Sequence, residues 1–173
     1  MKKLIAPLLV LLAGCAGIPE GVTPVAGFEA ERYLGVWHEI ARLDHSFERG
    51  LTGVTAEYSA RSDGGLDVVN RGYDAASGKW KEVRGRAYFT GPRDVGRLKV
   101  SFFRPFYGGY NIVELDREGY SYSLVCGPNR SYLWILARTP DLPAAVKERL
   151  AARAAELGFD AAALVYPGPA AKP

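Results

Sequence analysis

The feature that most constrains the fold is a series of short segments rich in β-forming residues, each separated from the next by turn residues. Turn signals stand at Asp63-Gly64-Gly65, Gly91-Pro92 and Gly127-Pro128-Asn129. Many short strands divided by such clusters are typical of an antiparallel sandwich or barrel. The connections are too short for the crossover helix that parallel strands need. The sequence therefore predicts an all-β fold and disfavours parallel α/β folds, and with them most nucleotide-binding enzymes.

Eight segments are expected to be strands. They cover residues 35–43, 52–60, 66–73, 79–90, 97–103, 107–116, 120–127 and 132–139. In the last of them apolar side chains occupy both alternating sets of positions, so both faces of that strand are expected to be covered. In a barrel, one face would look into the lumen and the other would lie under a packed helix.

One helix is expected after the last strand, over residues 141–157. Val146, Leu150, Ala154 and Leu157 recur at helical spacing and give a single narrow apolar stripe. A stripe of this kind is typical of a helix that packs against a sheet. Residues 163–166 are expected to form a short last strand.

The N-terminus predicts export. A basic start at Lys2 and Lys3 precedes an apolar run that is too short to span a bilayer. The run ends in Leu12-Ala13-Gly14-Cys15, which resembles the lipobox of bacterial lipoproteins. That resemblance implies a signal peptide over residues 1–14 and a lipidated Cys15.

The same resemblance implies where the protein resides. Ala16 follows the cysteine, and the absence of Asp at that position favours the outer membrane. Two or three acyl chains make a durable anchor. We therefore expect a lipidated tether over residues 15–27, a folded domain over 28–166 that faces the periplasm, and a flexible tail over 167–173.

Charge and cysteine content exclude several classes. The formal net charge is only +3, and two of those charges lie in the signal peptide, so no nucleic-acid-binding surface is expected. With Cys15 lipidated, Cys126 has no internal disulfide partner and is expected to be a small buried residue. No Cys/His group has metal-ligand spacing, and no metal or cofactor is expected.

Three motifs in order resemble those of the lipocalin family. Gly35 and Trp37 match the G-x-W signature, Leu115-Asp116 with Tyr120-Ser121-Tyr122 is similar to the second motif, and Arg138 is similar to the third. Longer stretches are similar to bacterial outer-membrane lipocalins, among them GVWHEIARLDHSFERGL and KVSFFRPFYGGY. The resemblance implies an eight-stranded antiparallel up-and-down β-barrel with one C-terminal packing helix.

The resemblance also implies structural roles for the motif residues. Trp37 would plug the closed end of the barrel, with Arg138 lying across its indole ring. Gly35 would allow close approach of the backbone, and Asp116 belongs to the second motif. The first long connection, over residues 44–51, would fold over the barrel entrance.

The implied ligand is hydrophobic, such as a fatty acid or a lysophospholipid. Tyr and Trp suit an acyl chain with a polar head, because they combine apolar surface with a hydrogen-bonding group. Tyr107 and Trp134 match positions that line the pocket in the bacterial family. The further pocket candidates are Phe102, Tyr110, Tyr122 and Phe89.

Other functions stay open at this point. The chain is expected to be a carrier and not an enzyme, but a lipocalin-type enzyme that uses Cys126 is an alternative, as is a structural or partner-binding envelope lipoprotein. His38 and His45 are the only histidine candidates for haem. The protein is expected to be a monomer or a weak homodimer.

Overall fold

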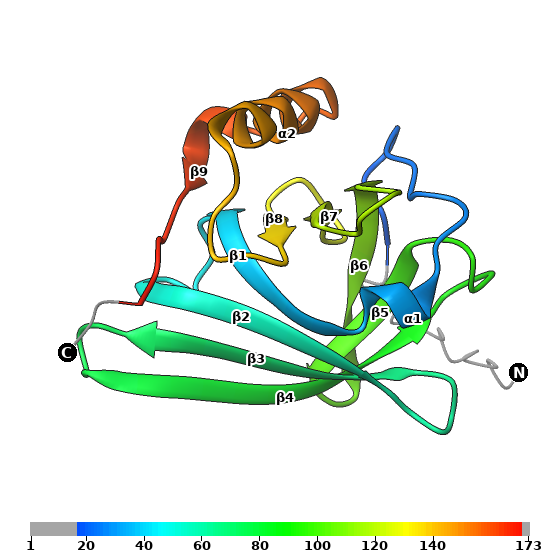
Figure 1. The fold of residues 1–173 in the computed structure, drawn as a ribbon. Coiled ribbons are helices and arrows are strands. Elements are labelled where there is room, and N and C mark those ends of the chain that lie inside the picture. The colour runs from blue at the N-terminus through cyan, green and yellow to red at the C-terminus, as the bar shows by residue number, and fades with distance from the viewer. Residues whose placement is uncertain (1–16, 171–173) are drawn as a thin grey trace, which may run out of the picture.

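The computed structural model describes residues 17–170, which form a closed antiparallel barrel and one packed helix (Figure 1). Each barrel strand pairs with its neighbours in the chain, and β1 pairs with both β8 and β2 to close the sheet. The strands are β1 (Gly35–Leu43), β2 (Leu51–Ala60), β3 (Leu66–Asp74), β4 (Lys79–Phe89), β5 (Arg97–Phe103), β6 (Phe106–Leu115), β7 (Tyr122–Cys126) and β8 (Leu133–Ala137). The expected eight-stranded up-and-down barrel is confirmed.

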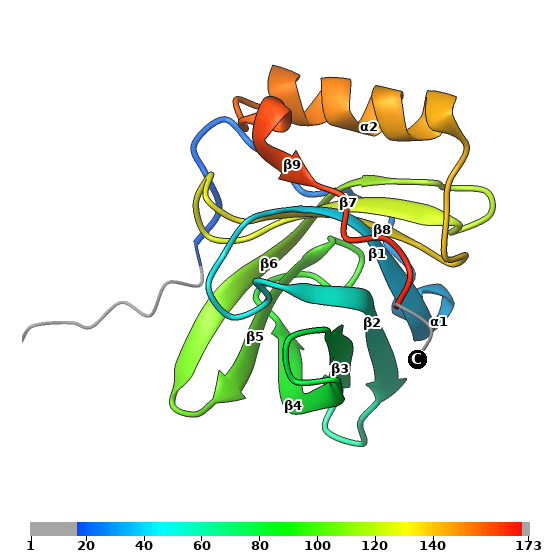
Figure 2. The same ribbon diagram turned by 90° about the vertical axis from the view of Figure 1, so that its left-hand side faces the viewer.

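The remaining elements cover the barrel from outside. Helix α2 (Ala144–Glu156) crosses over β1, β7 and β8 (Figure 2), and η1 (Ala161–Ala163) leads to the short β9 (Leu164–Val165), which pairs with β1. The packing helix begins three residues later than predicted, with Pro143 as its cap residue. A short helix, α1 (Ala30–Tyr33), precedes β1 and was not expected.

Two strands are three residues shorter than predicted. The segment expected over 120–127 forms a strand only at Tyr122–Cys126, and the one over 132–139 only at Leu133–Ala137. Tyr120 has a positive φ of 51° and belongs to the preceding turn. Its backbone N–H donates to the carbonyl of Asp116, 2.9 Å away. The turn geometry therefore delays the start of β7.

The apolar side chains divide into two clusters, one on each face of the barrel wall. The lumen core fills the inside of the barrel. Its buried members are Phe28, Ala30, Tyr33, Trp37, Tyr58, Leu66, Val68, Ala87, Leu98, Ile112, Leu115, Tyr120, Val125 and Leu136. The helix core lies between the wall and α2. Its members include Ile40, Leu124, Cys126, Ile135, Leu150, Ala154 and Phe159. Alternate residues of β7 and β8 thus face the two clusters, as strand geometry requires.

Ion pairs hold the register of β2, β3 and β4 on the outer face. Arg71 on β3 lies 2.9 Å from a carboxylate oxygen of Glu57 on β2 and 2.8 Å from one of Glu82 on β4. These groups are partly exposed, so the ladder contributes little to overall stability. Opposite charges on neighbouring strands nevertheless disfavour a shifted register.

The described ends of the chain lie against the barrel. Val22 is buried, and the N–H of Val25 donates to the carbonyl of Ile112 over 2.8 Å, although residues 15–27 were expected to be a tether. In the expected tail, the carbonyl of Gly168 accepts from the N–H of Gly53 over 2.9 Å. The signal peptide and Cys15 lie outside the described residues. Neither helix within residues 17–170 has the length and apolar character needed to cross a membrane.

Candidate functional site

One end of the barrel is closed by Trp37, whose side chain is 0% exposed. Its indole N–H donates to the carbonyl of Tyr33 over 2.8 Å. The guanidinium carbon of Arg138 lies 4.1 Å from the centre of the indole ring, and its two amino groups donate to the carbonyls of Val36 and Arg32. This is the arrangement that the motifs implied, and it seals the end that α1 covers.

Gly35 and Asp116 support this closed end. Gly35 has a φ of +92°, and a Cβ at this position would stand 3.4 Å from Arg138 Nη1. Only glycine takes such a backbone conformation without strain. The carboxylate of Asp116 accepts from the hydroxyl and the backbone N–H of Ser121, which fixes the turn between β6 and β7.

Above the closed end, three tyrosine hydroxyl groups meet inside the lumen. The hydroxyl oxygen of Tyr110 lies 2.9 Å from that of Tyr33 and 2.8 Å from that of Tyr58, and Tyr33 also bonds to Ser123. Burial raises the pKa of Tyr33 to about 12, and it raises the pKa values of Tyr58 and Tyr110 well above the ordinary value. These hydroxyl groups stay protonated and form a polar floor in an otherwise apolar space.

A buried group of charged residues, here called the entrance cluster, lies where the β1–β2 loop meets the barrel wall. Arg42 is 2% exposed and donates to the carboxylate of Glu39 and to the carbonyl of Glu48. Trp134 Nε1 donates to Glu48 Oε2 over 3.0 Å, and His45 Nε2 lies 3.1 Å from the same oxygen. The cluster therefore binds the loop to β1 and β8.

Burial raises the pKa of Glu39 to about 8, and the neighbouring charge of Glu48 acts in the same direction, against the lowering effect of Arg42. Arg42 Nη1 donates to this carboxyl, and Arg42 Nη2 donates to the carbonyl of Glu48. The guanidinium therefore supplies the buried carboxyl with a charged partner.

The free energy of unfolding is expected to carry a contribution from Glu39 that falls as the pH rises from 4.5 to about 8. The pKa of this carboxyl is higher in the folded than in the unfolded protein, so folding takes up a proton within this window. The contribution is complete below the unfolded pKa and is lost as the pH passes the folded pKa.

The variant Glu39→Gln, which keeps a neutral side chain at every pH, should lack this slope. Thermal unfolding of both proteins between pH 4.5 and 8.5 checks the prediction. His38, whose pKa burial lowers, gives an opposite slope in both proteins and cancels in the comparison. Parallel pH profiles would contradict the assignment.

Four of the six pocket candidates pack against the lumen core: Phe89, Phe102, Tyr110 and Trp134. Phe89 lies near the closed end, with its ring centre 6.2 Å from that of Phe28. Trp134 lies at the opposite end, beside the entrance cluster. All four are only partly buried, so each keeps surface that a ligand can contact.

The other two candidates, Tyr107 and Tyr122, do not face the lumen. The ring of Tyr107 lies on the outer face, 4.9 Å from Lys99 Nζ and 6.4 Å from the ring of Tyr88. Tyr122 packs against the helix core, with the guanidinium of Arg149 on α2 5.0 Å from its ring centre. Both expectations were wrong, because alternation separates the two faces of a strand without saying which of them is inside.

Sequence reasoning also missed the entrance cluster. Glu39 and Arg42 stand inside an apolar strand, three positions apart, and alternation would place them on opposite faces. The register of β1 against β8 shifts between Glu39 and Ala41, and this bulge turns both side chains toward each other. Two opposite charges within a buried strand were the available signal.

A second feature is a cleft of about 490 Å³ in the wall between β4 and β5. The residues that line it come from β2, β3, β4, β5 and the β5–β6 turn. They are Ser59, Asp67, Val68, Val69, Arg84, Gly85, Arg86, Ser101, Phe102 and Arg104. No group of His, Cys, Asp or Glu within residues 17–170 is arranged to hold a metal ion.

Comparison with known proteins places this geometry in a family. The profile of the lipocalin-like domain matches residues 28–169. The chain belongs to the lipocalin family. This lipocalin is 56% identical to the outer membrane lipoprotein Blc of Vibrio cholerae over 157 residues, which cover 91% of this chain and 92% of the relative.

Further comparisons agree with this assignment. The lipocalin is 54% identical to the outer membrane lipoprotein Blc of Escherichia coli K12 over 161 residues, which cover 93% of this chain and 90% of the relative. Among solved structures it resembles insecticyanin of the tobacco hornworm Manduca sexta, with a TM-score of 0.68 and 20% identity. That match covers 87% of this chain and 86% of insecticyanin, and at this identity it shows the fold alone.

Proposed function

We propose that this chain is an outer-membrane-anchored lipocalin that carries or stores hydrophobic ligands, such as fatty acids or lysophospholipids, in its barrel. The anchor is the lipidated Cys15, and the domain faces the periplasm. The names of the two Blc relatives, which span nearly the whole chain, support this location.

The observation that carries the proposal is the partly buried aromatic lining of the lumen beyond its closed end. The closed end is packed around fully buried Trp37, whereas Phe102, Tyr110 and Trp134 keep exposed surface farther along the barrel. Apolar and aromatic walls with a few polar groups are typical of sites for small hydrophobic ligands. The tyrosine hydroxyl groups and the entrance cluster supply those polar groups.

Native mass spectrometry tests the proposal when the protein is expressed without its leader and Cys15. The expected result is a near-stoichiometric mass of a fatty acid or lysophospholipid, matched by the lipid extract of the same sample. A barrel that is empty and also refuses added lipids would contradict lipid carriage. It would favour the alternative of a structural or partner-binding envelope lipoprotein.

The enzymatic alternative rests on Cys126, and the surroundings of this thiol favour a structural role. Cys126 is fully buried in the helix core, on the outer side of the wall. Burial raises the pKa of its thiol to about 12, so the reactive thiolate does not form at neutral pH. Neither histidine is a sheet partner of Cys126, which pairs with Asn111 and Leu133. His38 pairs with Ala137 and Thr55, and His45 lies in the β1–β2 loop.

We therefore expect Cys126 to resist thiol reagents in the folded protein. When a protein without Cys15 is incubated with an aromatic disulfide reagent at pH 8, almost no aromatic thiolate should be released from the reagent until denaturant is added. One equivalent should then react. Rapid labelling without denaturant, at the rate of a free cysteine, would contradict this assignment and strengthen the enzymatic alternative.

The oligomeric state stays a prediction: a monomer or a weak homodimer.

A further inference from the structure

The cleft between β4 and β5 exists because these two strands separate. Their pairing runs only from Phe89 opposite Leu98 to Arg86 opposite Ser101. Beyond that point, the register of β5 against β6 shifts between Val100 and Phe103, and Figure 2 shows the β5–β6 hairpin turned away from β4. On the side of β5, the first half of β4 thus has no partner strand within the described part of the sheet.

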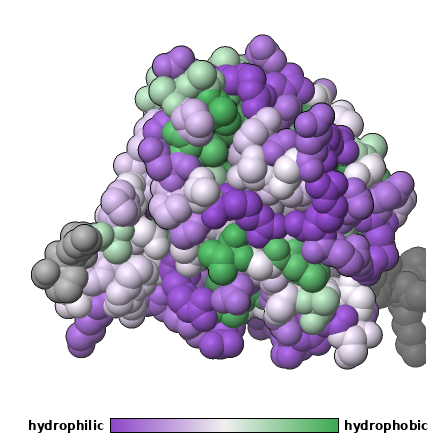
Figure 3. Space-filling model, in the orientation of Figure 1, coloured by the Kyte–Doolittle hydropathy of each residue, from purple (hydrophilic) through white to green (hydrophobic). Residues whose placement is uncertain are grey.

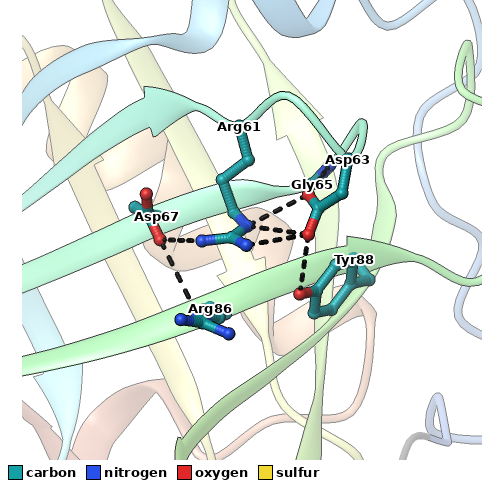
Figure 4. A network of polar contacts seen from close by, with 6 residues as sticks. All are labelled: Arg61, Asp63, Gly65, Asp67, Arg86 and Tyr88. Atoms are coloured by element: carbon teal, nitrogen blue, oxygen red, sulfur yellow. Dashed lines mark hydrogen bonds and ion pairs between the residues drawn. The ribbon is translucent and has the colours of Figure 1, made fainter.

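The lining of this cleft carries an excess of positive charge. It includes Arg84, Arg86 and Arg104 but only one acid, Asp67. Asp67 is already bound by Arg61, 2.7 Å away, whereas Arg86 stands 4.0 Å from it (Figure 4). The negative charge of Asp67 is therefore balanced by Arg61, which does not line the cleft.

The two outer arginines are available to an anion. Arg84 pairs with Glu82, but that carboxylate is shared with Arg71 of the outer ladder. Arg104 is exposed and forms no ion pair among residues 17–170. Guanidinium groups bind phosphate well because their planar donors match its oxygens.

A buried hydroxyl group also points to an occupant of the cleft. Ser101 lines the cleft and is 5% exposed, and its Oγ has no hydrogen-bond partner among the described residues. A buried polar atom without a partner is costly unless a ligand or water supplies one. This hydroxyl group stands in the same lining as the three arginines.

The lining of the cleft also includes apolar residues that belong to the lumen side of the wall. Val68 belongs to the lumen core, and Phe102 packs against it. A Cβ on Gly85 would come within 2.7 Å of the Phe102 ring, so glycine at this position provides the space that the ring occupies. Charged groups outside and apolar groups inside favour an amphipathic ligand over a free ion.

The adjacent hairpin end carries two exposed aromatic residues. Phe103 and Phe106 are 76% and 77% exposed, on either side of Arg104. Large apolar side chains at such exposure, next to a cation, suit contact with an anionic lipid.

The face drawn in Figure 3 shows apolar surface beside α2 and β9 and, separately, at the level of β2, with a hydrophilic band between them.

We propose that the cleft between β4 and β5 binds the phosphate group of an anionic lipid whose acyl chain enters the lumen past Phe102. Arg84, Arg86 and Arg104 neutralise the phosphate, and Ser101 donates a hydrogen bond to it. This inference rests on the proposed function, since it names the head group that the lipid carrier prefers.

Calorimetric titration with two lipids of equal acyl chain tests the inference. One is a lysophosphatidylglycerol, and the other is the uncharged monoacylglycerol. The delipidated protein should bind the anionic lipid about fivefold to tenfold more tightly. The double variant Arg84→Gln/Arg104→Gln should lose this preference and keep its affinity for the uncharged lipid. The double variant Arg84→Lys/Arg104→Lys should keep part of the preference.

The matched control is Arg149→Gln/Arg153→Gln, which removes two partly exposed charges from α2, a helix that contributes no residue to the cleft. This control should leave the preference intact. The inference would be overturned if the cleft variant kept the preference for the anionic lipid, or if the control lost as much of that preference as the cleft variant. In both cases lipid binding itself would persist. Competition by millimolar inorganic phosphate would reassign the cleft to free phosphate. Failure of both lipids to bind would instead overturn the proposed function.

Discussion

Replacing Arg42 with alanine is expected to destabilise the folded protein by about 3–5 kcal/mol, because it leaves buried charge without a partner. Arg42 donates to Glu39 and to the carbonyl groups of Glu48 and Leu51, and it supplies the one cation between two buried carboxyl groups. Without it, the carboxyl of Glu39 and the carbonyl of Glu48 lose their donor, and the β1–β2 loop loses an attachment to β1.

Urea denaturation at pH 7 measures this loss. The matched control is Arg71→Ala, which removes an arginine from two partly exposed ion pairs and should cost less than about 1 kcal/mol. Equal effects of the two substitutions at pH 7 would contradict the account of the entrance cluster.

Replacing Trp37 with alanine is expected to cost about 3–5 kcal/mol, the range for a large aromatic residue removed from a core. The indole is completely buried and has three kinds of contact to lose. Its ring centre lies 4.5 Å from that of Tyr33, its N–H donates to the Tyr33 carbonyl, and Arg138 covers its face. The cavity left at the closed end also removes the surface on which Arg138 rests.

The control for Trp37 is Trp80→Ala, since Trp80 is 60% exposed and its ring contacts only that of Tyr73 among the aromatic pairs of residues 17–170. This substitution should cost less than about 1 kcal/mol. Far-ultraviolet circular dichroism should follow the unfolding, because the tryptophan signal differs between the variants. A smaller loss for Trp37→Ala than for Trp80→Ala would show that the closed end does not hold the barrel together.

Local sequence patterns predicted most of the fold. Turn residues and alternating apolar positions predicted the order of the eight strands and the single packing helix, because those signals act over a few residues. The motif residues Gly35, Trp37 and Arg138 meet at the closed end because they belong to adjacent elements around β1 and β8. Such short-range and family-level information is present in the sequence itself.

The errors concern which face of a strand looks inward. Tyr107 and Tyr122 lie on strands whose two faces are both apolar or aromatic in part, so alternation alone cannot assign the inside. The expected tether was a similar case. Residues without periodicity were interpreted as a flexible segment. Val25 nevertheless forms backbone hydrogen bonds with Gly96, just before β5, and with Ile112 of β6, which only the folded barrel brings within reach.

The entrance cluster and the cleft depend on β-bulges, which no local sequence pattern predicted. One register shift between Glu39 and Ala41 joins two charged side chains, and another between Val100 and Phe103 turns a hairpin away from β4. Register is a property of paired strands and is decided by contacts between distant segments. The polar features of this barrel were therefore the least predictable from sequence.

The most direct test of the central claim is energy transfer from Trp134 to a fluorescent fatty acid. Trp134 lies inside the barrel near the entrance, Trp37 at the closed end, and Trp80 on the outer face of β4. Titration of the delipidated protein should give saturable transfer at micromolar fatty acid with one site per chain. The variant Trp134→Phe should lose a large share of the transfer, and Trp80→Phe should keep nearly all of it. No saturable signal, or a loss confined to Trp80→Phe, would contradict a ligand site in the barrel.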